Sequence, residues 1–208
     1  MFGGATDPGL RRSFHSPLRP GLGMGLIPRR PFREGSTSPR DRLERSGMTD
    51  EQKQTIGRAL GKVPSGVYIL TVTHEGQSTA ALISWAQQAG FEPPAMTIAM
   101  AKDRHARSLI DAGGAFALSI LAKTDVGFMK KYGRGIPEGE DPFAGINIGN
   151  TPGGAIYLAD SLAWLECRLL KTCDFGGDHD IYVAGITAAA LLKDEAPFTH
   201  VRGNGFHY

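Results

Sequence analysis

The residues with the most distinctive chemistry follow a short apolar run in the stretch FEPPAMTIAMAKDR, residues 91–104. Lys102 and Arg104 alternate at the end of that predicted strand and would point the same way. Arg104 also stands at the start of a predicted helix, where unpaired backbone N–H groups and the helix dipole favour an anion. Ser108 returns a hydroxyl to that side of the helix four residues later. The pattern predicts a phosphate site, and the alternative is a solvated helix start with ordinary surface charge.

A second candidate lies in the stretch ISWAQQAGFEPP, where a predicted strand ends and a polar loop with two glutamines follows. The side chains of Ser84 and Gln88 can hydrogen-bond the edge of a planar ring system, as can the backbone N–H groups of the loop. Trp85 can stack on such a ring or form a wall beside it. The alternative is a tryptophan that anchors the core next to a solvated loop.

His179 is the third candidate, because it stands between Asp178 and Asp180 in the stretch GGDHD. An imidazole held by carboxylates can donate a proton or contact a substrate. It can equally be a turn residue between two strands. A metal site is the weaker interpretation, since no second histidine or cysteine lies within ligand spacing.

The stretch FMKKYGRGIPEGEDPFAG offers further cations and an aromatic ring. Lys130, Lys131 and Arg134 either face a nucleotide or are ordinary cations near the end of a helix. Phe143 either covers a ring or packs. His105 has no partner visible in the sequence and is interpreted as a surface or packing residue.

The elements that must position these residues are mostly strands. Runs of β-branched and aromatic residues bounded by turn signals predict strands, and capped segments predict helices. The predicted strands are residues 67–73, 79–85, 96–101, 116–121, 161–174 and 180–192, with short closing segments at 198–201 and 206–208. The predicted helices are residues 50–60, 104–112 and 124–132, with caps at Thr49, Asp103 and Thr124. Residues 133–154 are expected to form a loop.

The number and order of these elements predict the fold class. Strands outnumber helices and most connections are short, which favours a mainly β fold over a doubly wound sheet: an antiparallel barrel with short peripheral helices. The sequence has no glycine-rich dinucleotide loop between a strand and a helix, and no Walker loop. We expect one domain over residues 48–208.

Residues 1–47 differ in composition from the rest of the chain. They are rich in Gly, Pro, Arg and Ser, and they hold nine arginines and four acidic residues. No apolar period appears, so burial cannot offset the entropy of ordering, and we expect a disordered basic tail. The alternatives are a transit peptide, an arm that contacts nucleic acid, or upstream sequence before a true start at Met48. Thr49 and Gln52 form a predicted capping box directly after that methionine.

Composition argues against several function classes. The 208 residues carry a formal net charge of only +2, and acids outnumber bases beyond residue 47, so the domain has no electrostatic case for binding nucleic acid. No apolar run reaches the roughly 18 residues of a membrane span. Cys167 and Cys173 would lie about 20 Å apart on a regular strand, too far for a disulfide. We interpret both as reduced thiols of a cytoplasmic protein.

Taken together, the motifs resemble those of flavin reductase-like domains. They are ALGKVPSGVYILTV, SWAQQAGFEPPAMTIAMAKDR, FMKKY, DPFAG, LADSLAWLEC and GGDH, in this order over about residues 55–208. The similarity is greatest to the C-terminal flavin reductase module of diflavin flavoproteins. Each motif is short, but six in the same order are specific. The resemblance implies an FMN-binding split β-barrel that is usually a homodimer.

The resemblance also implies roles for individual residues. The segment that lines the flavin ring corresponds to Ser84, Trp85, Gln88 and Ala89. The segment that holds the FMN phosphate corresponds to Lys102, Asp103, Arg104 and Ser108. The histidine near the groove for flavin and nicotinamide corresponds to His179, which is the expected catalytic residue.

The activity that the resemblance implies is NAD(P)H-dependent flavin reduction. Such an oxidoreductase passes hydride from NAD(P)H to flavin and can supply reduced flavin to a partner monooxygenase. The chemistry requires positioning rather than a protein nucleophile, which agrees with a sequence that has no obvious catalytic triad. The alternatives are an FMN-bound electron-transfer module with a protein electron donor, and a non-catalytic flavin-binding protein.

Overall fold

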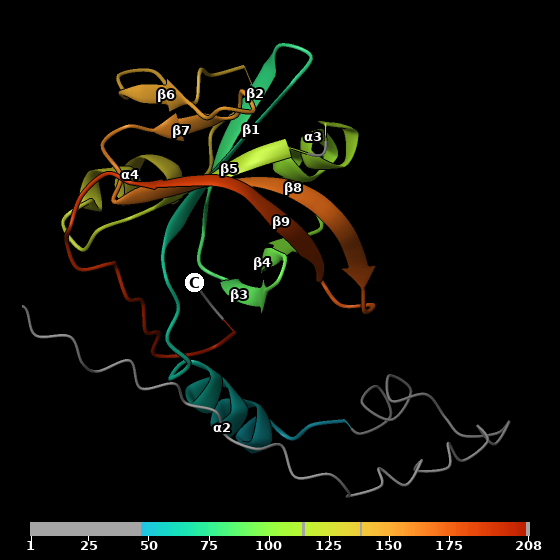
Figure 1. The fold of residues 1–208 in the computed structure, drawn as a ribbon. Coiled ribbons are helices and arrows are strands. Elements are labelled where there is room, and N and C mark those ends of the chain that lie inside the picture. Colours follow the sequence, from blue (N-terminus) through green and yellow to red (C-terminus); the bar gives the residue numbers. More distant parts are fainter. Residues whose placement is uncertain (1–46, 114, 138, 207–208) are drawn as a thin grey trace, which may run out of the picture. The chain divides into compact units, whose positions relative to one another are not determined.

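A computed structural model of the chain describes residues 47–113, 115–137 and 139–206 (Figure 1). The tail expected at residues 1–47 lies outside this part of the chain except for Gly47, so the explanations offered for it stay predictions. His207 and Tyr208 also lie outside it.

One seven-stranded antiparallel sheet dominates the structure, as the sequence predicts. Its strand order is β2-β1-β5-β8-β9-β4-β3. The strands are β1 Tyr68–His74, β2 Gln77–Ile83, β3 Ala86–Phe91, β4 Pro94–Ala101, β5 Ala115–Ile120, β8 Ala163–Asp174 and β9 His179–Leu191. A second, two-stranded sheet pairs β6 Ile148–Asn150 with β7 Ile156–Leu158. Figure 1 shows the long β8–β9 hairpin curving across the centre of the fold.

Three short helices accompany the strands within the described residues: α2 Asp50–Leu60, α3 His105–Gly113 and α4 Val126–Tyr132. The capping box predicted for α2 is confirmed, because Gln52 N donates to Thr49 Oγ1 at 3.2 Å and Thr49 N donates to Gln52 Oε1 at 2.9 Å. These bonds satisfy backbone and side-chain groups at the helix start.

The cap predicted for the third helix is wrong. Asp125, not Thr124, occupies the N-cap position of α4. The hydroxyl of Thr124 instead donates to Glu195 Oε2 at 2.9 Å, and Asp125 Oδ2 accepts from Ala122 N at 2.8 Å. The Thr124 hydroxyl is therefore used in a contact distant in sequence rather than at the helix start.

The polar loop predicted after Trp85 is also wrong, because residues 86–91 form strand β3. This strand pairs with β4 at the edge of the sheet, and its register shifts between Gln88 and Gly90. An edge strand has a single pairing partner, and solvent covers most of its side chains, so it needs no apolar alternation. The expected strand at residues 198–201 is reduced to a bridge between Ser65 and His200.

Helix α3 is held on the sheet by an apolar face. Ala106, Leu109 and Ile110 are buried, at the i, i+3 and i+4 spacing of an amphipathic helix. Each fully buried Leu or Ile side chain contributes roughly 1.5–3 kcal/mol. Ala106, Leu109 and Ile110 join a core cluster with Leu70, Val72, Ala86, Met96, Ile98, Met100, Phe116, Leu118, Cys167, Tyr182 and Ala184. Packing here fixes where the residues before α3 must lie.

The two cysteines are unpaired, as predicted. Cys167 is buried and Cys173 is exposed. Burial raises the pKa of the Cys167 thiol to about 12, so this group stays protonated at neutral pH. Among the helices of the described residues, none combines the length and the apolar character needed to cross a membrane.

Glu166 is a buried carboxylate that joins β8 to the loop before β7. Only 4% of the residue is exposed. It accepts hydrogen bonds from Gly153 N at 2.6 Å and from Thr187 Oγ1 at 2.6 Å. Burial by itself would raise the pKa of this carboxyl, but bonds from Thr151, Thr187 and Gly153 lower it overall. The ionised form is thus the one that the fold stabilises.

We predict that Glu166→Gln lowers the free energy of unfolding at pH 7 by about 1–3 kcal/mol, because an amide cannot replace a carboxylate that accepts from several donors. Urea denaturation of the two proteins measures the difference. Exposed Glu92 provides the matched control, since Glu92→Gln should leave stability within about 0.5 kcal/mol of the original.

The pH dependence of that difference follows from the direction of the pKa shift. A lowered pKa in the folded state stabilises the protein above the unfolded pKa of about 4.3, and the contribution is lost as pH falls through the folded pKa. The difference in the free energy of unfolding between the original protein and Glu166→Gln should therefore become smaller in acid. A difference in the free energy of unfolding that is the same at every pH would contradict the role of the ionised carboxylate.

Candidate functional site

Four cavities follow one another on the folded part of the chain, and shared residues link them. We call them the hairpin cavity (≈ 790 Å³), the Arg104 cavity (≈ 380 Å³), the Trp85 cavity (≈ 450 Å³) and the Ser84 cavity (≈ 310 Å³). Thr79, His105 and Ile136 line both the hairpin and the Arg104 cavities. His179 lines the Arg104 and Trp85 cavities, and Trp85 lines the Trp85 and Ser84 cavities.

Arg104 lies in its cavity with Asp103 from the same segment, at the entry to α3. The guanidinium passes close to Gly135, where an added Cβ would lie 3.9 Å from Arg104 Nη1. Gly135 has φ +79°, a conformation that favours glycine. Within the described part of the chain, the Arg104 side chain forms no hydrogen bond or ion pair. A cation in a cavity without a carboxylate partner is suited to binding an anionic ligand.

Lys102 does not join Arg104. Its Nζ lies 2.9 Å from Asp174 Oδ1 and 3.5 Å from Asp180 Oδ1. The hydrogen bond to Asp174 is the main reason that the pKa of Lys102 is raised. Lys102 lines none of the four cavities. The structure therefore places this predicted phosphate ligand in an ion-pair network instead.

Arg107 is part of that network and was missed by the sequence reasoning. It pairs with Asp180 through Nη2, donates to the Tyr182 hydroxyl from Nε at 3.0 Å and donates to the Lys102 carbonyl from Nη1 at 3.1 Å. Asp180 is only 2% exposed, so its charge requires a cation. The aspartate beside His179 was a usable signal, because a charged residue in a buried strand predicts a nearby partner.

His179 lies between the Arg104 cavity and the Trp85 cavity. Its Nδ1 lies 3.0 Å from Asp178 Oδ1, and this hydrogen bond lowers the pKa of the Asp178 carboxyl. Its ring centroid lies 4.8 Å from that of Trp85, with 48° between the planes. Because His179 is only 9% exposed, the carboxylate and the indole fix its orientation. The structure thus brings together His179, Trp85 and the Arg104 cavity, as the sequence predicts.

Arg202 is a second residue that the sequence reasoning missed. Its guanidinium carbon lies 5.1 Å from the centroid of the Trp85 ring, in a cation–π contact, and it lines the Trp85 cavity. Arg202 N donates to the Gly61 carbonyl at 3.0 Å, and Gly205 N donates to the Gly57 carbonyl at 2.6 Å. These bonds tie residues 200–205 to α2. A separation of more than a hundred positions hid the contact with Trp85.

Ser84 is buried at 4% exposure and lines the cavity named after it. Among the described residues, its Oγ has no hydrogen-bond partner. A buried hydroxyl without a hydrogen-bond partner is costly, and this one belongs to a residue on a cavity wall.

Three predicted flavin-site residues, Gln88, Ala89 and Ser108, line none of the four cavities. Gln88 Nε2 donates to the Gly90 carbonyl at 3.4 Å on the exposed edge strand, and Ala89 is exposed beside it. Ser108 Oγ donates to the carbonyl of His105 in its own helix at 2.9 Å. His105, which was interpreted from the sequence as a surface or packing residue, lines both the hairpin and the Arg104 cavities.

Comparison with known proteins identifies relatives of the whole domain. Residues 60–207 match the model of the flavin reductase like domain. Diflavin flavoprotein A 1 of Synechocystis sp. is 35% identical over 155 residues, which cover 74% of this chain and 27% of that protein. The chain therefore spans about a quarter of the length of the curated relatives it matches.

Solved structures support the same assignment. A homologue of nitrilotriacetate monooxygenase component B from Mycobacterium thermoresistibile is 26% identical, with a TM-score of 0.63 over 70% of this chain and 80% of that chain. The NADH:FAD oxidoreductase of Streptomyces globisporus C-1027 is 24% identical, with a TM-score of 0.65 over 70% of this chain and 86% of that chain. These matches confirm the expected split β-barrel. Because the motifs occur in their expected order and the family model matches residues 60–207, this chain belongs to the flavin reductase-like domain family.

Proposed function

We propose that this chain binds the FMN moiety of a flavin and transfers hydride to it from NAD(P)H. The observation that carries the proposal is the unpaired Arg104 guanidinium, which lies in a cavity linked through His179 to the wall formed by Trp85. An FMN moiety has an anionic phosphate at one end and a flat ring system at the other. The Arg104 cavity offers a cation for the phosphate, and the Trp85 cavity offers an aromatic wall for the ring system.

The residues present fit a flavin on a second observation. The Ser84 hydroxyl is buried on the wall of a cavity beside Trp85 and lacks a hydrogen-bond partner among the described residues. The edge of an isoalloxazine ring carries carbonyl oxygens and ring nitrogens that can pair with such a hydroxyl. Binding would therefore satisfy a group that the protein alone leaves unsatisfied.

The protein's contribution to the chemistry would be positioning and electrostatics. A bound flavin supplies the group that accepts hydride. Arg104 anchors the phosphate through charge-assisted hydrogen bonds, and Trp85 excludes water from one side of the ring site. Asp178 holds the His179 imidazole at the junction of two cavities, where it would contact the nicotinamide substrate.

We also propose the setting in which the protein works. The split-barrel relatives named above include a monooxygenase component, which supports a monooxygenase as the consumer of reduced flavin. We propose that the protein is a homodimer. We also propose that it is located in the cytoplasm, because both of its cysteine thiols are unpaired. Light scattering of the full chain would test the dimer.

A second candidate function is electron transfer from a protein donor. It is favoured by one observation: the curated relatives are diflavin flavoproteins about four times as long as the matched region, so this domain works there beside others. An anaerobic spectrum separates the two functions. Flavin absorbance that NADH or NADPH bleaches within seconds supports the reductase, and absorbance that only a protein donor bleaches supports electron transfer.

We predict that Arg104→Ala weakens FMN binding by about 1–3 kcal/mol, which corresponds to roughly a five- to 150-fold increase in Kd, because a charge-assisted bond to the phosphate is lost. Quenching of flavin fluorescence on titration with protein measures the Kd. The matched control is Arg58→Ala, which removes an exposed arginine on α2 and should leave the Kd unchanged. Unchanged FMN affinity in Arg104→Ala would remove the phosphate assignment.

For His179→Ala we predict a fall in the rate of NAD(P)H oxidation on the order of a hundredfold with FMN affinity retained, because a misplaced nicotinamide reacts slowly. Stopped-flow absorbance at saturating flavin gives the rate, and fluorescence quenching gives the affinity. His200→Ala is the control, since His200 lines none of the four cavities. A normal rate in His179→Ala would leave this residue with a purely structural role at the start of β9.

A further inference from the structure

The proposed phosphate site at Arg104 is short of positive charge. A phosphate monoester carries about −1.5 to −2 charges at pH 7, and one guanidinium offsets only one of them. Lys102 is paired with an aspartate outside the cavity, and the Ser108 hydroxyl donates to a carbonyl of its own helix. Asp103, which lines the cavity, adds negative charge. A further cation would therefore strengthen the binding of a phosphate.

The structure leaves few residues that can supply this charge. Besides Arg104, the residues lining the cavity that can carry a positive charge are His105 and His179. The Nδ1 atom of His179 lies 3.0 Å from Asp178 Oδ1, so a carboxylate already compensates a charge on that ring. The cations of α4 and of the loop after it line none of the four cavities: Lys130, Lys131 and Arg134. His105 is the candidate that remains.

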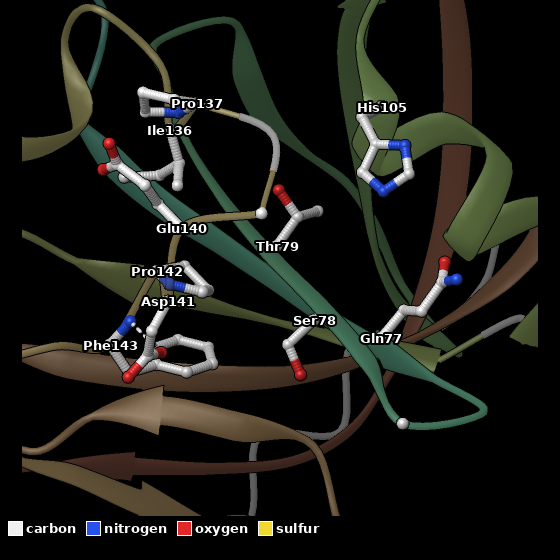
Figure 2. Close-up of a pocket in the computed structure, with 12 residues that line it drawn as sticks. Gln77, Ser78, Thr79, His105, Ile136, Pro137, Glu140, Asp141, Pro142 and Phe143 are labelled. Atoms are coloured by element: carbon white, nitrogen blue, oxygen red, sulfur yellow. Dashed lines mark hydrogen bonds between the residues drawn. The ribbon is translucent and has the colours of Figure 1, made fainter.

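His105 lies where its ring can reach an anion held by Arg104. It is the first residue of α3, directly after Arg104, and it lines both the Arg104 cavity and the hairpin cavity. Figure 2 shows it on the opposite side of the hairpin cavity from Glu140. Among the described residues, the exposed His105 ring forms no hydrogen bond, ion pair or ring contact. Both ring nitrogens are therefore open to a ligand.

The groups around His105 decide when its ring is charged. Strand β2 contributes only uncharged side chains to the two cavities. The titratable and charged residues that line them with His105 are Asp103, Arg104, Glu140, Asp141 and His179. The carboxylates attract an imidazolium, whereas the guanidinium and the start of α3 repel it. A phosphate bound at Arg104 would offset that repulsion, so protonation of His105 and binding of phosphate favour each other.

We propose that protonated His105 is a second ligand of the flavin phosphate, and that its contribution to FMN affinity is lost as pH rises. The inference rests on the proposed function. An imidazole changes charge between roughly pH 5 and 8. The protonated ring donates a charge-assisted hydrogen bond to the phosphate, and the neutral ring adds no charge. The affinity of the site for FMN is thereby coupled to the pH of the surroundings.

The test measures the Kd of the full chain for FMN by fluorescence quenching at about pH 6 and about pH 8.5, on either side of the imidazole range. His105→Gln should raise the Kd roughly fivefold at the lower pH and leave it within about twofold at the higher. The phosphate loses its second proton near pH 6 in both proteins, so the ratio of their Kd values isolates His105. Riboflavin, which lacks the phosphate, should bind both proteins equally. The matched control is His200→Gln, which should leave the FMN affinity unchanged because His200 lines none of the four cavities.

A second variant separates charge from a structural role. His105→Lys places a permanent cation at the same exposed position and should bind FMN more tightly than the original protein at about pH 8.5. A Kd ratio between His105→Gln and the original protein that is the same at both pH values would overturn the proposal and leave FMN binding at Arg104 intact. An equal loss of riboflavin affinity in His105→Gln would overturn it as well. Failure of the original protein to bind FMN at either pH would remove the proposed function itself, and this inference with it.

Discussion

The structure around the site depends on neutralising one buried carboxylate. Asp180 is 2% exposed at the start of β9, and a charge so placed is costly unless cations reach it. Arg107 from α3 pairs with one carboxylate oxygen, and Lys102 lies 3.5 Å from the other, too far for a good hydrogen bond but within ion-pair range. The end of β4, the start of α3 and the start of β9 are therefore fixed to one another.

That constraint divides three neighbouring cations between two tasks. Arg107 pairs with Asp180, and Lys102 pairs with Asp174 and lies within ion-pair range of Asp180. Arg104, which stands between them in the chain, lines a cavity. The same constraint places His179, the residue before Asp180, on the wall of that cavity. The ion-pair network thus has a structural role, and among the described residues it leaves the Arg104 side chain without a hydrogen bond or ion pair. Composition alone would have counted all three cations as equivalent.

The sequence predicted most of the elements because their signals are local. The capping box of α2, the β-branched run of β1 and the long β8–β9 hairpin each depend on residues within a few positions. Edge strand β3 was missed because solvent covers its glutamines and no alternation marks it. In the site, Trp85 and His179 were predicted to share a site and do meet, whereas Arg202 was missed because only the fold brings it to Trp85. Charge partners across strands, such as that of Lys102, are equally invisible to spacing.

The bonds between α2 and residues 200–205 have a consequence for biosynthesis. One side of the Trp85 cavity comes from Leu60 and Val63, which precede the first strand of the sheet, and another comes from Arg202 and Phe206, which follow the last. During translation, the barrel strands emerge from the ribosome before this second wall exists. A nascent chain can therefore form most of its hydrogen-bonded sheet without a closed pocket at the tryptophan. A ligand that needs both walls of this pocket would then bind only after residues 202–206 have left the ribosome.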